Sequence, residues 1–247
     1  MMPTNNYVIL GASGGIGSET CKRLRESGSN VLLAGRNEDR LRSLSQDLDA
    51  PFRVLDATDF DQMQACIDHA SETLGMVDGI VNCVGSVLLK PAHLTSPSEW
   101  HDTVATNLTS AFATVRAGYR AMRKKGGTIV LMTTAAARIG LPNHEAIAAA
   151  KAGVIGLMQS AAASYAARGI RVNAVAPGLV KTAMTQRIWS NEKSAEFSRT
   201  MHAIGRLGEP GDVASLLVWL LQPENDWVTG QVFGVDGGLG TLHSTGR

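Results

Sequence analysis

Residues 7–17 read YVILGASGGIG, and this stretch decides the fold class. Its first four residues predict a short buried strand, and Gly11, Gly15 and Gly17 follow where a helix is expected to begin. At such a junction the chain must turn tightly, approach a pyrophosphate without a Cβ in the way, and offer helix N-terminal N–H groups to negative charge. Glycines also mark ordinary turns, but the strand before them and the helix after them favour a dinucleotide site.

The rest of the chain alternates between short apolar runs and longer amphipathic patterns. After the strand at 7–10, strands are predicted at 30–34, 52–55, 78–82, 127–132, 170–176 and 231–235. Helices are predicted at 15–27, 37–48, 59–74, 98–124, 145–168 and 210–221. This alternation predicts a Rossmann-like α/β fold, with a doubly wound, parallel, seven-stranded sheet and helices on both faces. No linker or repeat divides it, so residues 1–247 are expected to form one domain.

The segment 183–205 departs from this alternation because it is polar and lacks a strand pattern. Its place between two regular elements suits a mobile lid over a substrate cleft. An ordinary helical excursion on the surface is the alternative.

Composition excludes several kinds of partner. Lys and Arg total 23 against 22 Asp and Glu, in no basic patch, so we expect a small-molecule substrate and no nucleic acid or membrane. The three cysteines lack metal-ligand spacing, which argues against a metal site and a disulfide framework and favours the cytoplasm. The N-terminus shows no signal-peptide pattern. The alanine-rich run at 146–167 is interrupted by Lys151, so we expect it to form a packed helix of a soluble protein and not a membrane span.

The end of the second predicted strand bears on the choice of cofactor. NAD-binding folds commonly place a carboxylate there for the ribose 2′-hydroxyl, but this chain has Gly35 followed by Arg36, which can pair with a 2′-phosphate. NADP(H) is therefore favoured over NAD(H). The alternative is that Arg36 stacks on the adenine or only solvates the loop. A second basic residue in the glycine turn would favour NADP(H) further, but that position is Gly14.

Taken together, these motifs resemble the short-chain dehydrogenase/reductase family over essentially the whole chain. The glycine turn matches with Leu10 in place of the usual threonine, and Asn82-Cys83-Val84-Gly85 stands where the family has Asn-Asn-Ala-Gly. The resemblance implies a cofactor site formed by Gly11, Ser13, Gly15, Ile16, Gly17, Arg36, Asp56, Asn82, Gly85, Lys151, Pro177, Gly178 and Thr182.

The same resemblance implies hydride transfer to a carbonyl or from an alcohol. In the family a tyrosine handles the proton, a lysine four residues later lowers the phenol's pKa and binds the ribose, a serine thirteen residues before the tyrosine bonds the substrate oxygen, and a helix asparagine holds a relay water. Here Lys151 is the lysine, Thr134 replaces the serine, and Asn107 matches the asparagine. The tyrosine position, however, is Ile147, which can transfer no proton.

Another group must therefore supply the proton if the reaction survives. His144 is one candidate because it precedes Ile147 at a position that lines the family's substrate pocket, and imidazole suits proton transfer near neutral pH. Its alternative role is a loop residue bonded to backbone. Lys151 is a second candidate if burial lowers its pKa, and water is a third.

Two functions remain open from the sequence. One is an NAD(P)(H)-dependent oxidoreductase acting on a small carbonyl or alcohol with a non-standard proton donor. The other is a catalytically inactive, cofactor-binding homologue that serves as a sensor or partner subunit. The resemblance further implies a homo-oligomer, a tetramer or dimer, built through the helices 98–124 and 145–168 and the last strand.

Overall fold

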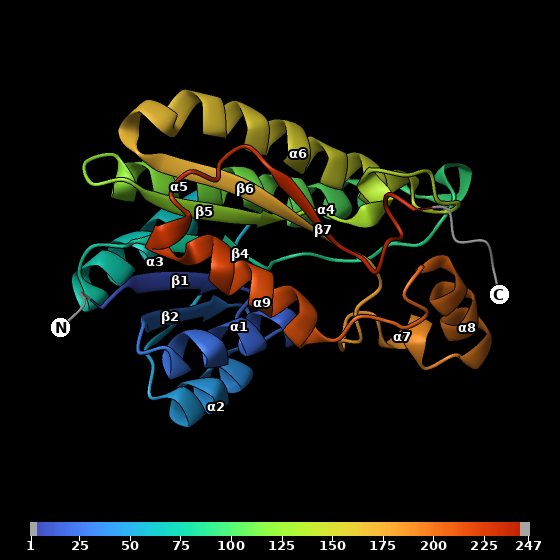
Figure 1. The fold of residues 1–247 in the computed structure, drawn as a ribbon, viewed down its shortest axis with the longest axis horizontal. Helices are drawn as coiled ribbons and strands as arrows, with labels where there is room; N and C mark the ends of the chain where they lie inside the picture. Colours follow the sequence, from blue (N-terminus) through green and yellow to red (C-terminus); the bar gives the residue numbers. More distant parts are fainter. Residues whose placement is uncertain (1–3, 243–247) are drawn as a thin grey trace.

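The computed structural model describes residues 4–242, which form a seven-stranded sheet with helices on both faces (Figure 1). All neighbouring strands are parallel, in the order β3-β2-β1-β4-β5-β6-β7. The strands are β1 (Asn6–Leu10), β2 (Asn30–Gly35), β3 (Phe52–Val54), β4 (Gly79–Asn82), β5 (Gly127–Met132), β6 (Ile170–Pro177) and β7 (Val232–Val235). The predicted fold class is confirmed, and each expected strand is present to within a few residues.

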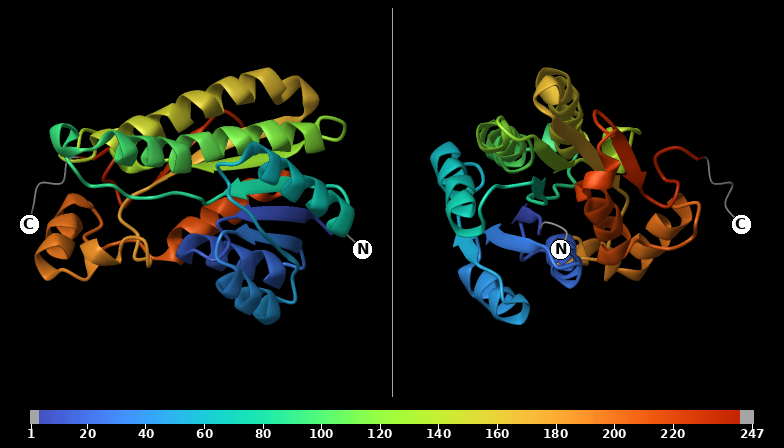
Figure 2. Two further views of the ribbon diagram at one scale, coloured as in Figure 1. Left: turned by 180° about the vertical axis from the view of Figure 1, so that it is seen from behind. Right: turned by 60° about the vertical axis from the view of Figure 1, so that its left-hand side comes forward.

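The helices divide between the two faces of the sheet. One face carries α3 (Phe60–Leu74), α5 (Ser110–Met122) and α6 (Glu145–Tyr165), with α4 (Pro97–Val104) beside α6. The other carries α1 (Gly15–Glu26), α2 (Glu38–Leu48) and α9 (Pro210–Leu221). The right-hand view of Figure 2 shows the sheet between these two groups. Because β1, β4 and β5 are buried on both faces, their continuous apolar runs are explained.

The strand order reverses between β1 and β4, where the chain passes from one half of the sheet to the other. The crevice outside the carboxyl ends of the strands at such a switch point is the usual ligand site of an open parallel sheet. Leu10 at the end of β1 pairs in register with Asn82 at the end of β4, so the two loops that follow begin side by side.

One helix differs from the sequence-based expectation. The pattern at 98–124 predicts a continuous helix, but α4 and α5 are separated by a π-helical turn at Ala105–Thr109. The Asn107 side chain donates to the Thr103 carbonyl within this wider turn. Single π turns inside longer helices occur frequently at functional sites.

Helix α6 and its extension through Arg168 are long and apolar enough to cross a membrane, by length and composition only. The helix packs against β6 and α5, and it carries Lys151 on its buried side. These contacts are those of a core helix, which passes the same length and hydropathy test.

The segment 183–205 folds into two short helices, α7 (Gln186–Trp189) and α8 (Glu192–Met201), which project beyond the carboxyl ends of the strands (Figure 1). The Trp189 indole donates to the Thr182 carbonyl at 2.9 Å, so α7 is attached to the loop after β6.

Candidate functional site

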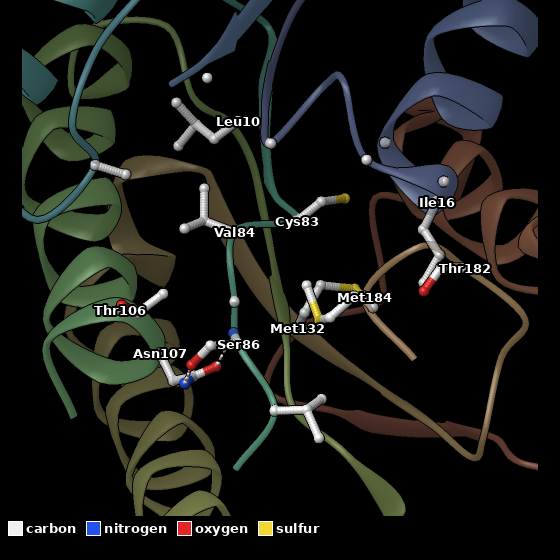
Figure 3. A pocket seen from close by; sticks show the side chains of 18 of the residues that line it. Leu10, Ile16, Cys83, Val84, Ser86, Thr106, Asn107, Met132, Thr182 and Met184 are labelled. Atoms are coloured by element: carbon white, nitrogen blue, oxygen red, sulfur yellow. Dashed lines mark hydrogen bonds between the residues drawn. The ribbon is translucent and has the colours of Figure 1, made fainter. Parts of the chain in front are cut away.

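A cavity of about 630 Å³ opens at the carboxyl ends of β1, β4, β5 and β6 (Figure 3). It extends from the glycine turn after β1, past Gly85, to Lys151 on α6 and Thr182 in the loop after β6. Most of the residues predicted for the site therefore line one continuous space: Gly11, Ser13, Gly15, Ile16, Gly17, Arg36, Asp56, Gly85, Asn107, Thr134, Lys151, Pro177, Gly178 and Thr182.

The glycine turn is built to hold an anion. Gly11 has a φ of +74°, and a Cβ on it would lie 2.9 Å from the Cys83 carbonyl carbon. Gly14 caps α1 without a side-chain hydrogen bond, and the first turn of α1 contains no acidic residue. The first amides of α1 and the positive end of its dipole thus face the cavity, as a pyrophosphate requires.

Gly17 tests how tightly this turn is packed. A Cβ at this position would lie 2.3 Å from the Gly11 carbonyl oxygen, which is backbone and cannot move without opening the turn. We expect Gly17→Ala to lower the free energy of unfolding by about 1–3 kcal/mol through overpacking. Chemical denaturation would check this value. Gly156→Ala is the matched control, because a Cβ there meets nothing within 4 Å, and an equal loss in both variants would contradict the tight turn.

The distal end of the cavity presents two arginines. Arg36 follows β2, and Arg40 lies one turn into α2, where its backbone amide donates to the Asn37 side chain. Asp56 lies opposite, and its Oδ1 accepts from the amide and hydroxyl of Thr58. Arg40 is a basic lining residue that the sequence reasoning missed, although its spacing from Arg36 places it on the first turn of the next helix.

Asn82 acts beneath the cavity and does not line it. Its Oδ1 accepts from the Val84 amide at 2.8 Å, and its Nδ2 donates to the Thr114 hydroxyl at 2.9 Å. These bonds hold the loop after β4 in the path that brings Gly85 to the cavity. Its predicted cofactor role is therefore indirect in this structure.

Lys151 and Ile147 share one face of α6, as their spacing requires, and both line the cavity. Ile147 is 5% exposed and Lys151 is 7% exposed. The Lys151 Nζ donates to the Met132 carbonyl at 2.9 Å, and no acidic side chain within residues 4–242 forms an ion pair with it. Donors of Nζ thus remain for ribose hydroxyls or water.

Burial lowers the pKa of Lys151 from 10.5 to about 8. The ionisable group that interacts with Lys151 is Cys83. Burial raises the pKa of the Cys83 thiol to about 12, so this thiol stays neutral. A lysine that titrates near neutral pH beside a cavity has the acidity that proton transfer requires.

Asn107 and Lys151 converge on Gly85. A Cβ on Gly85 would lie 3.1 Å from the Asn107 Oδ1 and 3.5 Å from the Lys151 Nζ, so both atoms face the same glycine. The Asn107 Nδ2 donates to the Ser86 hydroxyl at 2.9 Å (Figure 3). It also donates to the Thr103 carbonyl at 2.9 Å. Both hydrogens of Nδ2 are used inside the protein, and Oδ1 accepts from the Ser86 amide at 3.2 Å, which leaves its second lone pair to accept from a water.

Thr134 lines the cavity at the end of β5, where the family pattern places a substrate-binding hydroxyl. Within residues 4–242 its Oγ1 makes two long bonds, to the Pro177 carbonyl at 3.5 Å and from the Ala136 amide at 3.4 Å. The preceding Thr133 donates to the Lys151 carbonyl at 2.9 Å and ties α6 to β5. Thr134 is therefore free to bond a substrate oxygen, while Thr133 positions the helix that carries Lys151.

His144 is not among the residues that line the cavity. It precedes α6, and its Nδ1 is bonded to the Pro142 carbonyl at 2.8 Å. The physical reason is local, because a loop histidine can satisfy its ring on a carbonyl two residues away. The position of the ring favours the loop role over the catalytic one.

Apolar side chains line the part of the cavity near Ile147. Met132 at the end of β5 and Met184 after β6 point into the cavity (Figure 3). Val87, in the loop after β4, also lines it. Ser86 is a polar residue that also lines the cavity, and its hydroxyl accepts a hydrogen bond from Asn107. The sequence gives no signal for this role, because the two residues are 21 positions apart. The reacting end is thus largely apolar with a few placed polar groups, as expected for a small organic ligand.

No group of three or more His, Cys, Asp or Glu side chains placed to hold a metal ion occurs between residues 4 and 242. Cys21, Cys66 and Cys83 are free thiols.

Comparisons with known proteins agree with this geometry. A family model described as enoyl-(acyl carrier protein) reductase matches residues 11–240. A 3-oxoacyl-(acyl-carrier-protein) reductase, FabG of Thermotoga maritima, is 34% identical over 241 residues, covering 94% of this chain and 96% of the relative.

Solved structures give the same result. A short-chain type dehydrogenase/reductase from Mycobacterium ulcerans matches with a TM-score of 0.92 and 29% identity, covering 97% of this chain and 91% of the other. ElxO with NADP bound matches with a TM-score of 0.90 and 27% identity, covering 97% of this chain and all of the other (100%).

Proposed function

This chain belongs to the short-chain dehydrogenase/reductase family, and we propose that it is an NADP(H)-dependent oxidoreductase that acts on a small carbonyl compound or alcohol without a catalytic tyrosine. The observation that carries the proposal is the buried Lys151. Its Nζ faces the same cavity as the uncapped start of α1 and has no acidic partner among the described residues.

The residues present fit a nicotinamide dinucleotide. Glycines leave room for a pyrophosphate beside α1, Arg36 and Arg40 suit the phosphorylated ribose, and Lys151 suits the other ribose. The cofactor, when bound, supplies or accepts the hydride.

Side chains of the protein bind the substrate oxygen and supply the proton that this oxygen receives. Thr134 donates a hydrogen bond to the substrate oxygen, and the Lys151 ammonium holds the proton that this oxygen receives during reduction. A water between Nζ and the Asn107 Oδ1 carries the proton where Nζ itself does not reach, since both atoms face Gly85. In the oxidative direction the neutral Lys151 amine accepts the proton instead. His144, outside the cavity lining, is a less suitable donor.

The cofactor preference gives a direct test. We expect Arg36→Ala to raise the Kd for NADPH about tenfold or more, because a charge-assisted bond to the 2′-phosphate contributes about 1.5–3 kcal/mol, and to leave NADH affinity nearly unchanged. Fluorescence titration of both cofactors measures this. Arg42→Ala is the matched control, because Arg42 pairs with Glu38 and does not line the cavity. Equal losses for NADPH and NADH would contradict the preference.

The second candidate function is a cofactor-binding protein without turnover. Ile147 favours it, because a buried hydrocarbon stands where the family's proton donor is found. Such a protein would bind NADPH with ordinary affinity and oxidise none of it in the presence of carbonyl compounds.

We also propose that the protein is a cytoplasmic homo-oligomer with a small-molecule substrate. Strand β7 ends the sheet with one edge unpaired in the described chain, and Phe112 on α5 and Trp219 on α9 are large side chains left about half exposed. Association would bury them. Size-exclusion chromatography with light scattering is expected to give a multiple of 26.1 kDa. A mass equal to one chain would contradict this expectation.

A further inference from the structure

His202, at the end of α8, is buried and has both ring nitrogens bonded. The Leu179 backbone amide donates to its Nε2 at 3.1 Å, so Nε2 must be the unprotonated nitrogen. Nδ1 therefore carries the hydrogen and donates to the Ser198 carbonyl at 2.6 Å. With 3% of the residue exposed, water does not replace these bonds. The structure thus defines one tautomer of a neutral imidazole.

The ring joins two segments that shape the cavity. Ser198 belongs to α8, and Leu179 lies between Gly178 and Val180, both of which line the cavity. A Cβ on Gly178 would lie 2.4 Å from His202 Nε2, so the ring packs directly on the backbone of that loop. A displacement of α8 is therefore transmitted to the loop that holds Pro177 and Thr182.

The charged groups near the ring are bonded to partners other than His202 in residues 4–242. Asp236, after β7, uses its two oxygens on the amides of Gly238 and Gly240. The other charged residues that line the same surface hollow as His202 are paired: Arg206 with Asp212, Glu209 with Lys181, and Arg23 with Glu19. On α8 itself, Arg199 pairs with Glu192 and Glu196. A proton on Nε2 would point at the Leu179 N–H, and the bond between the two segments would be lost.

We propose that His202 is a positioning residue that fastens α7 and α8 to the cofactor loop 177–182 only while its imidazole is neutral. Acidification that protonates the ring breaks the bond between α8 and this loop. The loop is then less well positioned, and the affinity for the cofactor falls. The role concerns the position of the segment 183–205, and it stands whether or not the protein turns over a substrate.

The test compares two substitutions. In His202→Gln the amide oxygen replaces Nε2 as acceptor for the Leu179 amide and does not titrate, whereas His202→Leu fills the space without an acceptor. Hydrogen exchange of the amides of α7 and α8, corrected for the intrinsic rate, is measured at pH values from about 5 to 8, the range in which histidine charge changes occur. NADPH affinity is measured by fluorescence over the same range.

We expect the wild type to lose at least about tenfold in exchange protection of α8, and in NADPH affinity, on acidification. His202→Gln should keep the protection seen at high pH and lose the pH dependence, and His202→Leu should be unprotected at every pH. His101→Gln, on the exposed side of α4, is the matched control and should behave as the wild type. Wild-type protection in His202→Leu, or an unchanged pH dependence in His202→Gln, would overturn the proposal. Because no readout requires turnover, failure of the proposed oxidoreductase activity would be seen separately.

Discussion

Replacing Ile147 with tyrosine is expected to increase the rate of carbonyl reduction by about 100-fold. A phenol at this position would extend from α6 into the cavity, one helical turn from Lys151, whose ammonium favours ionisation of the phenol. General acid–base catalysis contributes about 10²–10⁴ in rate, and the gain should fall at the lower end because Lys151 already supplies a slower route for the proton. The measurement is kcat with NADPH and a panel of small carbonyl compounds.

Ile147→Phe is the control for this experiment, because it adds the same ring without the hydroxyl. Its kcat should stay at or below that of the wild type, while NADPH affinity is retained in both variants. An equal gain with phenylalanine would show that cavity shape, and not proton transfer, limits the wild-type rate.

The second large effect is expected at Lys151, where activity and stability should change in opposite directions. Lys151→Met removes the proposed proton source, so kcat/KM for carbonyl reduction should fall by at least about 100-fold. The same change removes a buried ammonium, and the shift of its pKa from 10.5 to about 8 corresponds to an unfavourable burial of about 3 kcal/mol. Allowing for the lost bond to the Met132 carbonyl, the free energy of unfolding at pH 7 should rise by about 2 kcal/mol.

Lys125→Met is the matched control, because Lys125 is exposed and pairs with Asp78 at the surface. It should change neither quantity appreciably. A Lys151→Met variant that loses stability together with activity would indicate that Lys151 supports the fold and is not a buried functional group.

The pH dependence of the wild type follows from the same group. The folded chain releases the Lys151 proton near pH 8, whereas the unfolded chain retains it to about 10.5. The unfolded state binds more protons between these values, so the free energy of unfolding should increase with pH in this range. The acid form is lost over the same range, so kcat/KM for reduction should fall about tenfold per pH unit above pH 8. A flat alkaline profile would contradict the assignment of Lys151 as the acid.

The inner strands were predictable because β1, β4 and β5 are buried on both faces and are therefore apolar throughout, as in YVIL at 7–10 and GTIVLM at 127–132. The π-helical turn between α4 and α5 was not predictable. The π-helical turn carries Asn107, which bonds to Ser86, 21 residues earlier in the chain. The periodicity of apolar residues along a helix does not indicate such a contact.

Some residues of the site could likewise be predicted from the sequence, and others could not. The glycines and Arg36 could be chosen because their spacing fixes their place relative to strand and helix ends, whereas Thr134 and Lys151 were chosen through the resemblance to the family. All of them line the cavity. His144 was expected in the cavity, but the direction of its ring depends on a loop carbonyl. Ser86, Thr133 and His202 were missed because each acts through a three-dimensional contact that its own sequence neighbourhood does not indicate. Arg40 could have been found from its spacing after Arg36.

The central claim is that the cleft still performs redox chemistry although Ile147 occupies the position of the tyrosine. The most direct measurement follows NADPH absorbance with the wild-type protein and a panel of small carbonyl compounds, after NADPH binding has been established by fluorescence. We predict slow oxidation of NADPH, with at least one carbonyl compound, that declines above pH 8 and is lost in Lys151→Met. Tight NADPH binding without oxidation by the wild type, and turnover appearing only in Ile147→Tyr, would contradict the claim and identify a silent cofactor-binding protein.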